Sequence, residues 1–315
     1  MTRPGRAATG GPAAMLPATV PAIVLAATVL AATVLAATVL GACGSSAPAA
    51  APGTASVVSA PVRVAHTRLG AVGYREVGNG PPLVLIMGYG WNMEGWDPRL
   101  VHALAGHYRV VMFDNSGIGR TRLLPLPLSI PAMAGQTSAL ITALRLHRPD
   151  VLGWSMGGMI AQALAVRHPG QVRRLVLCAT YPGTGAAVIP PLSVMRGGRI
   201  FPASQGQAQA AYQAAIAAYP PAAPSATVVR ASQASAETDW WYGHDAAGRE
   251  VARIPVPTLV ADGTDDQLDP AANDRTLARL IPRARLVLYP GAGHGFLFQD
   301  RARFAALVGS FLAAG

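Results

Sequence analysis

Residues 153–157 read G-W-S-M-G, the spacing of a serine nucleophile held on a sharp turn. The buried apolar run 151–154 indicates a strand before the serine, and the pattern at 157–168 indicates a helix after it. Such a turn strains the serine backbone, and only glycine two residues to either side lets the neighbouring chains approach so closely. The helix dipole then favours negative charge developing at the serine. Ser155 is therefore the predicted nucleophile.

A serine nucleophile needs a base, and His294 is the histidine best placed to supply it. It follows a strand predicted at 285–289, in a glycine-rich segment that allows a loop to carry the imidazole over the sheet edge. The other histidines are assigned to helix surfaces, loops or strand ends. They are His66, His102, His107, His147, His168 and His244.

The acid that orients this histidine is expected after the strand predicted at 258–261, where four aspartates compete. Asp262 ends the strand too early, and Asp269 is placed to cap the helix that follows. Asp266 lies three residues after a glycine, at the loop tip that can reach back to the histidine. We therefore predict Asp266 as the acid and keep Asp265 as the alternative.

Acyl transfer also requires an oxyanion hole built from two backbone N–H groups. Met156, directly after the nucleophile, is predicted to supply one of them. Tyr89 is predicted to supply the other, because it lies in the Gly-Tyr-Gly segment that follows the buried run 82–87. The two glycines permit the required backbone turn, and the same pattern also suits a plain tight turn.

The elements that must position these residues alternate between strands and helices. Strands are predicted at 62–66, 71–77, 82–87, 109–113, 151–154, 174–179, 258–261 and 285–289. Helices are predicted at 96–106, 131–147, 157–168, 208–218, 271–280 and 300–313. This alternation predicts an α/β fold with a mostly parallel central sheet covered by helices on both faces. The interruption at 182–253 is too long for an ordinary loop, so we expect a small helical cap inserted after the sixth strand.

Composition narrows the functional class further. The chain has 315 residues, 51% hydrophobic and 13% charged, which excludes disorder beyond short stretches and suits one large domain. Two cysteines are too few for a disulfide scaffold, and His, Cys and Asp do not cluster, so no metal or other cofactor is predicted. The formal net charge is +10, but the arginines are scattered, so no nucleic-acid partner is predicted.

The N-terminal segment is predicted to serve targeting. An uncharged apolar stretch, 13–42, follows two arginines and is long enough to span a bilayer. A basic region, an apolar region and small residues at a cleavage point are typical of a signal peptide, here residues 1–42. Residues 43–60 are rich in Ala, Pro, Gly and Ser and are expected to form a flexible stalk. Residues 61–315 are then the folded domain.

The string LGAC, which ends at Cys43, resembles the lipobox of bacterial lipoproteins. The resemblance implies that Cys43 is lipidated and becomes the mature N-terminus. The protein would then be held by a lipid anchor on the outer side of the cytoplasmic membrane. The alternative is an uncleaved membrane anchor in which Cys43 is incidental. In both interpretations the domain is exported and stays tethered to the membrane.

Six segments resemble, in order, the signature segments of the alpha/beta-hydrolase superfamily. They are IMGYGWNMEGWDP, FDNSGIGRT, GWSMGGMIAQALAVRHP, VRRLVLCAT, VADGTDDQLDP and YPGAGHGFLF. The likeness is closest to the ester, lactone and haloperoxidase-like branch. It implies the nucleophile, acid, base and oxyanion amides named above. Many members have histidine where this chain has Met87 and arginine where it has Ser116, and these departures concern pocket polarity rather than the triad.

The predicted activity is hydrolysis of a small-molecule ester or lactone through an acyl-enzyme. An aminopeptidase or amidase is the alternative, because the same triad cleaves amides and Glu237 and Asp239 could hold a substrate amine. Ser155 argues against the epoxide hydrolases and dehalogenases of this fold, which use aspartate. Trp154 disfavours carbon–carbon bond hydrolases, which usually have asparagine there. A non-catalytic surface protein that retains the fold is the alternative from another class.

Overall fold

The computed structural model describes residues 55–197 and 199–314 and places eight strands in one sheet. The strands are β1 (Arg63–Thr67), β2 (Gly70–Val77), β3 (Pro82–Ile86), β4 (Arg109–Phe113), β5 (Asp150–Trp154), β6 (Leu175–Cys178), β7 (Thr258–Gly263) and β8 (Ala284–Tyr289). Their order across the sheet is β1-β2-β4-β3-β5-β6-β7-β8. Only β2 pairs antiparallel, with β1 and with β4, so the predicted mostly parallel sheet is confirmed.

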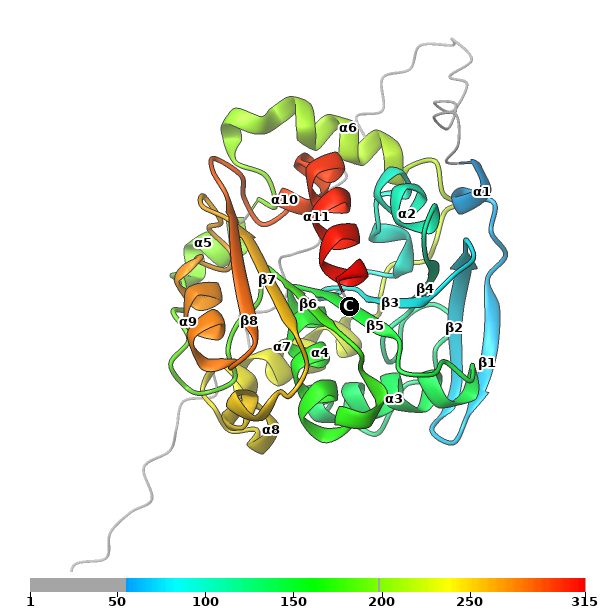
Figure 1. Cartoon of the computed structure of the whole chain (residues 1–315), viewed down its shortest axis with the longest axis horizontal. Coiled ribbons are helices and arrows are strands. Elements are labelled where there is room, and N and C mark those ends of the chain that lie inside the picture. The colour runs from blue at the N-terminus through cyan, green and yellow to red at the C-terminus, as the bar shows by residue number, and fades with distance from the viewer. Residues whose placement is uncertain (1–54, 198, 315) are drawn as a thin grey trace, which may run out of the picture.

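Each face of the sheet carries its own hydrophobic core, and helices cover both (Figure 1). Val84 and Ile86 of β3 enter one core, while Leu83 and Leu85 enter the other. A strand buried on both faces has to be apolar throughout, which explains the continuous hydrophobic runs in the sequence. This arrangement confirms the predicted layers.

The helices divide between the two faces according to the core that they join. On one face lie α1 (Ala55–Val58), α2 (Pro98–Ala105), α10 (Phe296–Gln299) and α11 (Arg301–Ala313). On the other face lie α3 (Ile130–Ala143), α4 (Met156–Arg167) and α9 (Ala272–Leu280). Short 3-10 turns occur at Met93–Gly95, Pro169–Gln171, Ala203–Gln205 and Val251–Arg253.

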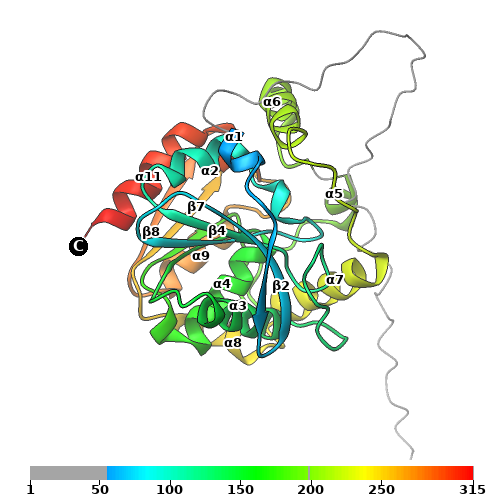
Figure 2. The same cartoon turned by 90° about the vertical axis from the view of Figure 1, so that its right-hand side faces the viewer.

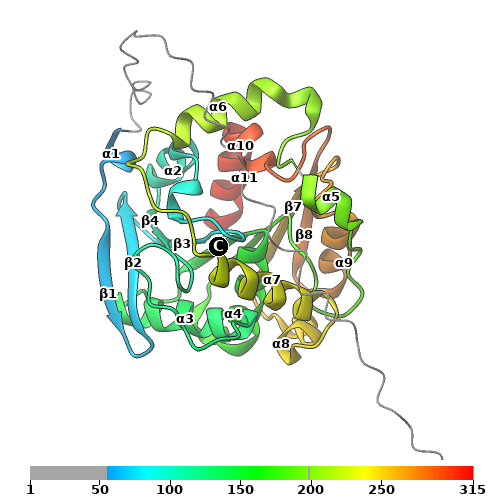
Figure 3. The same cartoon turned by 180° about the vertical axis from the view of Figure 1, so that it is seen from behind.

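The predicted insertion between β6 and β7 is present. It holds α5 (Leu192–Gly197), α6 (Gly206–Ile216), α7 (Thr227–Trp241) and α8 (Ala246–Arg249). Figure 2 shows α5, α6 and α7 along the same side of the molecule. The sequence analysis anticipated only the second of these helices and did not predict α7, which packs against α3 and α4 (Figure 3).

The described chain begins earlier than the domain boundary expected from the sequence. Residues 55–58 form α1, and Val57 is fully buried in the core beside α2 and α11. Arg75 donates a hydrogen bond to the Ala60 carbonyl. These residues therefore pack on the domain, whereas the sequence analysis assigned them to the flexible stalk. The predicted signal peptide and Cys43 lie outside the described residues. Among the described helices, none combines the length and the apolar character that a membrane span requires.

Candidate active site

Ser155 lies at the junction of β5 and α4 with φ +58° and ψ −126°, the strained conformation expected of an elbow. A Cβ on Gly153 would lie 2.2 Å from the Gly157 carbonyl oxygen, and a Cβ on Gly157 would lie 2.0 Å from the Ile86 carbonyl oxygen. Both contacts are with backbone, which cannot move aside. The turn predicted from the glycine spacing is therefore present. It requires glycine at both positions because any side chain there would collide with the neighbouring backbone, as expected.

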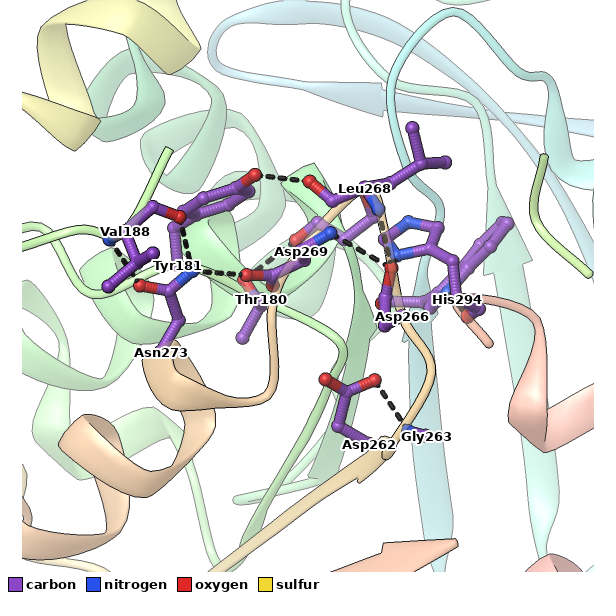
Figure 4. A network of polar contacts seen from close by, with 12 residues as sticks. Thr180, Tyr181, Val188, Asp262, Gly263, Asp266, Leu268, Asp269, Asn273 and His294 are labelled. Atoms are coloured by element: carbon purple, nitrogen blue, oxygen red, sulfur yellow. Dashed lines mark hydrogen bonds and ion pairs between the residues drawn. The ribbon is translucent and has the colours of Figure 1, made fainter. Parts of the chain in front are cut away.

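His294 and Asp266 meet beyond the ends of β7 and β8 (Figure 4). The distance from His294 Nδ1 to Asp266 Oδ2 is 2.7 Å, and both side chains are buried. Asp266 Oδ1 accepts hydrogen bonds from the backbone N–H groups of Leu268 and Asp269, at 2.8 and 2.9 Å. Asp265 instead is exposed and accepts a hydrogen bond from Thr264. The structure thus brings Asp266, and not the alternative Asp265, to the histidine.

Trp154 connects the elbow to the histidine. Its Nε1–H donates to the His294 carbonyl at 2.9 Å, and the two ring centroids are 5.2 Å apart. Among the described residues no hydrogen bond joins Ser155 to His294. The sequence analysis used Trp154 only to judge the reaction class and missed this positioning role. The signal was the indole N–H, which needs a partner when buried.

The loop after β3 passes directly beside Ser155. A Cβ on Gly88 would lie 3.1 Å from the Ser155 Cβ. Asn115 donates to the Met87 carbonyl at 2.8 Å on one side of the loop. The Gly90 N–H donates to Gln233 of α7 at 2.9 Å on the other side. Two separate elements therefore hold the backbone that carries the predicted Tyr89 amide.

The second predicted amide belongs to Met156, the first residue of α4. The first N–H groups of a helix have no partner within the helix, so this amide is free of the α4 ladder. Met156 directly follows Ser155 in the sequence. The loop that carries Tyr89 lies on the other side of Ser155, at the end of the neighbouring strand β3. The oxyanion role of both amides stays a prediction.

Three further aspartates, Asp262, Asp269 and Asp274, are fully buried close to Asp266. Burial, together with the neighbouring carboxylates, holds the pKa of each well above its ordinary value. None of the described His, Cys, Asp and Glu side chains forms a group of three or more suited to a metal ion.

The predicted role of Asp269 as a helix cap is wrong. Helix α9 begins at Ala272, one residue later than expected, and the residue at its N-cap position, Ala271, makes no side-chain hydrogen bond. Asp269 is turned inward, where its Oδ1 accepts from Asn273 Nδ2 at 2.7 Å. Asn273 also exchanges hydrogen bonds with the backbone of Val188 in the insertion. Asp269 therefore helps to hold the loop that carries Asp266 against the inserted helical cap.

Comparison with known proteins agrees with this geometry. Residues 81–300 match the family model of the alpha/beta hydrolase fold. The chain is 33% identical over 259 residues to 2-hydroxymuconate semialdehyde hydrolase of Pseudomonas sp. (strain CF600), covering 76% of this chain and 89% of the relative. It is 30% identical to the poly(3-hydroxyalkanoate) depolymerase of Ectopseudomonas oleovorans, covering 73% of this chain and 84% of the relative.

A solved structure is similar over the same region. The enol-lactonase from Burkholderia xenovorans LB400 superposes with a TM-score of 0.63 at 25% identity, covering 79% of this chain and 99% of the lactonase. The family model spans more than half of the chain, and the elbow and the His294–Asp266 pair occupy the loops where this fold carries its triad. The chain is a hydrolase of the alpha/beta hydrolase family.

Proposed function

We propose that the protein is a serine hydrolase that cleaves carboxylic ester or lactone bonds through an acyl-enzyme. The observation that carries the proposal is the pairing of His294 with Asp266 at 2.7 Å, beside a serine held at φ +58°. A buried carboxylate on Nδ1 fixes the imidazole so that its Nε2 is left to accept a proton.

The reaction then follows from the positions of the groups. Ser155 Oγ attacks the substrate carbonyl while its proton passes to His294 Nε2. The negative charge that forms on the carbonyl oxygen is stabilised by the amides of Met156 and Tyr89. His294 returns the proton to the leaving oxygen, and a water molecule activated by the same imidazole releases the acyl group.

Carbon–carbon bond hydrolysis is the second candidate, because a relative at 33% identity is named as a 2-hydroxymuconate semialdehyde hydrolase. Trp154, where such enzymes usually have asparagine, argues against this candidate. The aminopeptidase alternative loses one of its two acids, because Asp239 is exposed and pairs with His244 at 3.1 Å. Only Glu237 of that pair is buried in the cap.

A substrate panel tests the proposal. Purified protein is assayed with acyl p-nitrophenyl esters, lactones, aminoacyl anilides and a vinylogous keto acid, with Ser155→Ala as the control. We expect turnover of esters or lactones that is lost in the variant, and fluorophosphonate labelling of the wild type alone. Turnover of only the keto acid would replace this proposal with the second candidate, and labelling that persists in Ser155→Ala would overturn the nucleophile.

We also propose that the hydrolase is exported and anchored in the cytoplasmic membrane through a lipid on Cys43. The support is the sequence alone: an apolar segment that ends at LGAC, followed by small and polar residues. Residues 44–54 would then separate the membrane from α1, the first described element of the domain.

A further inference from the structure

Helix α7 of the cap crosses the carboxyl ends of three neighbouring strands. Near its middle, Gln233 accepts from the Gly90 N–H in the loop after β3, at 2.9 Å. At its C-terminal end, Trp240 Nε1 donates to the carbonyl of Tyr181, after β6, at 3.1 Å. In the sheet, β5 lies between β3 and β6. The turn of α7 between these two contacts therefore passes over the end of β5, where Ser155 lies.

Glu237 occupies that turn. It follows Gln233 by four residues and precedes Trp241 by four, so the three side chains share one face of the helix. Gln233 and Trp241 are buried, Trp241 against the ring of Tyr181 with centroids 5.0 Å apart. The Glu237 side chain is also buried, at 9% exposure. Its carboxyl consequently faces inward, between the loops on either side of Ser155.

The titratable and charged surroundings of Glu237 are sparse. Tyr89 comes from the loop after β3, Tyr181 from the loop after β6 and Asp269 from the loop after β7. The positive charge of Arg230, on α7 itself, lies near Tyr89 and works to lower the pKa of the Tyr89 hydroxyl. Helix α3 carries no charged residue, and α4 carries one, at its far end. Within the described chain, Glu237 has no hydrogen-bond or ion-pair partner.

A buried carboxyl without a cation or a donor is held in its neutral form, because ionisation in such a site is costly. Burial raises the pKa of Glu237 to about 8. A neutral carboxyl has an O–H to donate. One turn away, Nε2 of Gln233 is buried and has no hydrogen-bond partner either. Two unused donors therefore lie on the same face of α7, above the elbow.

The position of the base indicates which part of a substrate these donors meet. Trp154 belongs to the core on the face of the sheet covered by α2, α10 and α11, and His294 packs against Trp154. The leaving oxygen must reach His294 to receive its proton, so the alcohol part of an ester lies on that side. The acyl part extends the other way, toward the core that contains Trp240 and Trp241 of α7.

We propose that Glu237 and Gln233 form a polar subsite that donates hydrogen bonds to a neutral oxygen on the acyl group of the substrate. The oxygen is a hydroxyl, a ketone or a second ester carbonyl near the scissile bond. The two residues are specificity determinants, and the assignment rests on the proposed ester hydrolysis. An acyl chain without such an oxygen leaves both donors unpaired and is disfavoured.

The test compares two esters with the same leaving group, p-nitrophenyl 3-hydroxybutyrate and p-nitrophenyl butyrate. The measured quantity is the ratio of their kcat/KM values at pH 7. We expect the wild type to favour the hydroxy ester and Glu237→Leu to lower the ratio about tenfold, the loss of one hydrogen bond to a buried donor. Glu237→Gln keeps a donor and should keep the preference. Asp239→Asn, an exposed acid of the same helix, is the matched control and should leave the ratio unchanged.

The pH profile gives a readout that a purely structural role would not change. In the wild type, kcat/KM for the hydroxy ester should decline as pH rises through about 8, because ionised Glu237 no longer donates. The Glu237→Gln variant should lack this decline. A ratio and a profile that are the same in wild type, Glu237→Leu and Glu237→Gln would overturn the subsite while ester hydrolysis still stands.

Two other outcomes would have a different meaning from failure of the subsite. Absence of Ser155-dependent turnover of both esters would mean that the proposed function itself has failed. A preference for an aminoacyl ester that disappears in Glu237→Gln would show a carboxylate that binds a cation, which contradicts the neutral donor.

Discussion

The carboxylate of Asp266 uses both of its oxygens, one for the imidazole of His294 and one for two backbone N–H groups. The backbone bonds fix the carboxylate plane, and the carboxylate in turn fixes which imidazole nitrogen carries the proton. An amide at this position has nearly the same shape but presents either an oxygen or an NH₂ group to each partner. The residue therefore acts through its charge and its acceptors rather than its size.

We predict that Asp266→Asn lowers kcat by about 10⁴-fold, because the imidazole loses the partner that sets its tautomer. The measurement is steady-state hydrolysis of the best ester from the panel, with thermal unfolding to show that the variant is folded. Asp265→Asn is the control, since Asp265 is exposed and its side chain accepts a hydrogen bond from Thr264 rather than from His294. Equal losses in the two variants, or a larger loss in Asp265→Asn, would contradict the assignment.

At the scale of elements, the elbow depends on how closely α4 approaches β3. The Gly157 Cα lies so near the end of β3 that an added Cβ would meet the Ile86 carbonyl oxygen at 2.0 Å and the Met87 carbonyl oxygen at 2.9 Å. Both atoms belong to a buried strand and the turn after it, and neither can shift without disturbing the sheet. The close packing of this helix on the sheet is thus a requirement for placing Ser155.

Gly157→Ala should destabilise the fold by about 3 kcal/mol or more, at the upper end of the range for overpacking, because the clash is with backbone. Gly170→Ala is the matched control: an added Cβ there meets nothing within 4 Å, and the change should stay within about 0.5 kcal/mol. The free energies come from chemical denaturation followed by circular dichroism. A Gly157→Ala protein as stable as Gly170→Ala would show that the turn relaxes freely.

For the molecule as a whole, buried carboxyls govern how stability depends on pH. Burial raises the pKa of Glu237 from its ordinary 4.5 to about 8 and that of Asp114 from 3.8 to about 6. The pKa values of three buried aspartates behind Asp266 are raised as well. Between the ordinary and the raised value, the folded state keeps a proton that the unfolded chain has released. Stability therefore falls as pH rises through this interval.

We predict that the Tm declines between pH 4.5 and pH 8. Thermal unfolding in a series of buffers at constant ionic strength measures the slope. Glu237→Gln cannot titrate, so its slope over the same interval should be shallower than that of the wild type. A Tm that rises across this interval would mean that these carboxyls are ionised in the folded protein.

The proposed position of the molecule in the cell depends on its first residues. If Cys43 is lipidated, the mature chain begins there, and the anchor is strong, since each buried methylene contributes about 0.8 kcal/mol. Cys43→Ala should block lipidation and the cleavage that depends on it, which leaves a longer precursor. Mass spectrometry of the membrane fraction distinguishes the forms. An unmodified wild-type chain that still contains residues 1–42 would support the uncleaved anchor instead, and a soluble chain cut after Ala42 would support plain secretion.

The sequence alone was sufficient to predict the eight strands, the insertion and the turn at Ser155. Strands buried on both faces must be apolar along their length, and a turn as tight as the elbow admits only glycine at Gly153 and Gly157. Both constraints act on neighbouring residues, so they leave a pattern in the sequence that can be recognised without knowing the fold.

Helix α7, the inward turn of Asp269 and the role of Trp154 were decided only by the tertiary structure. The inner face of α7 carries Gln233 and Glu237 among its buried residues, so it lacks the apolar stripe that marks a helix in sequence. Its polar residues are buried because a loop more than 140 positions earlier in the chain, at Gly90, lies against them. Burial and hydrogen-bond partners of this kind depend on which distant segments meet, and that information arises only when the chain is folded.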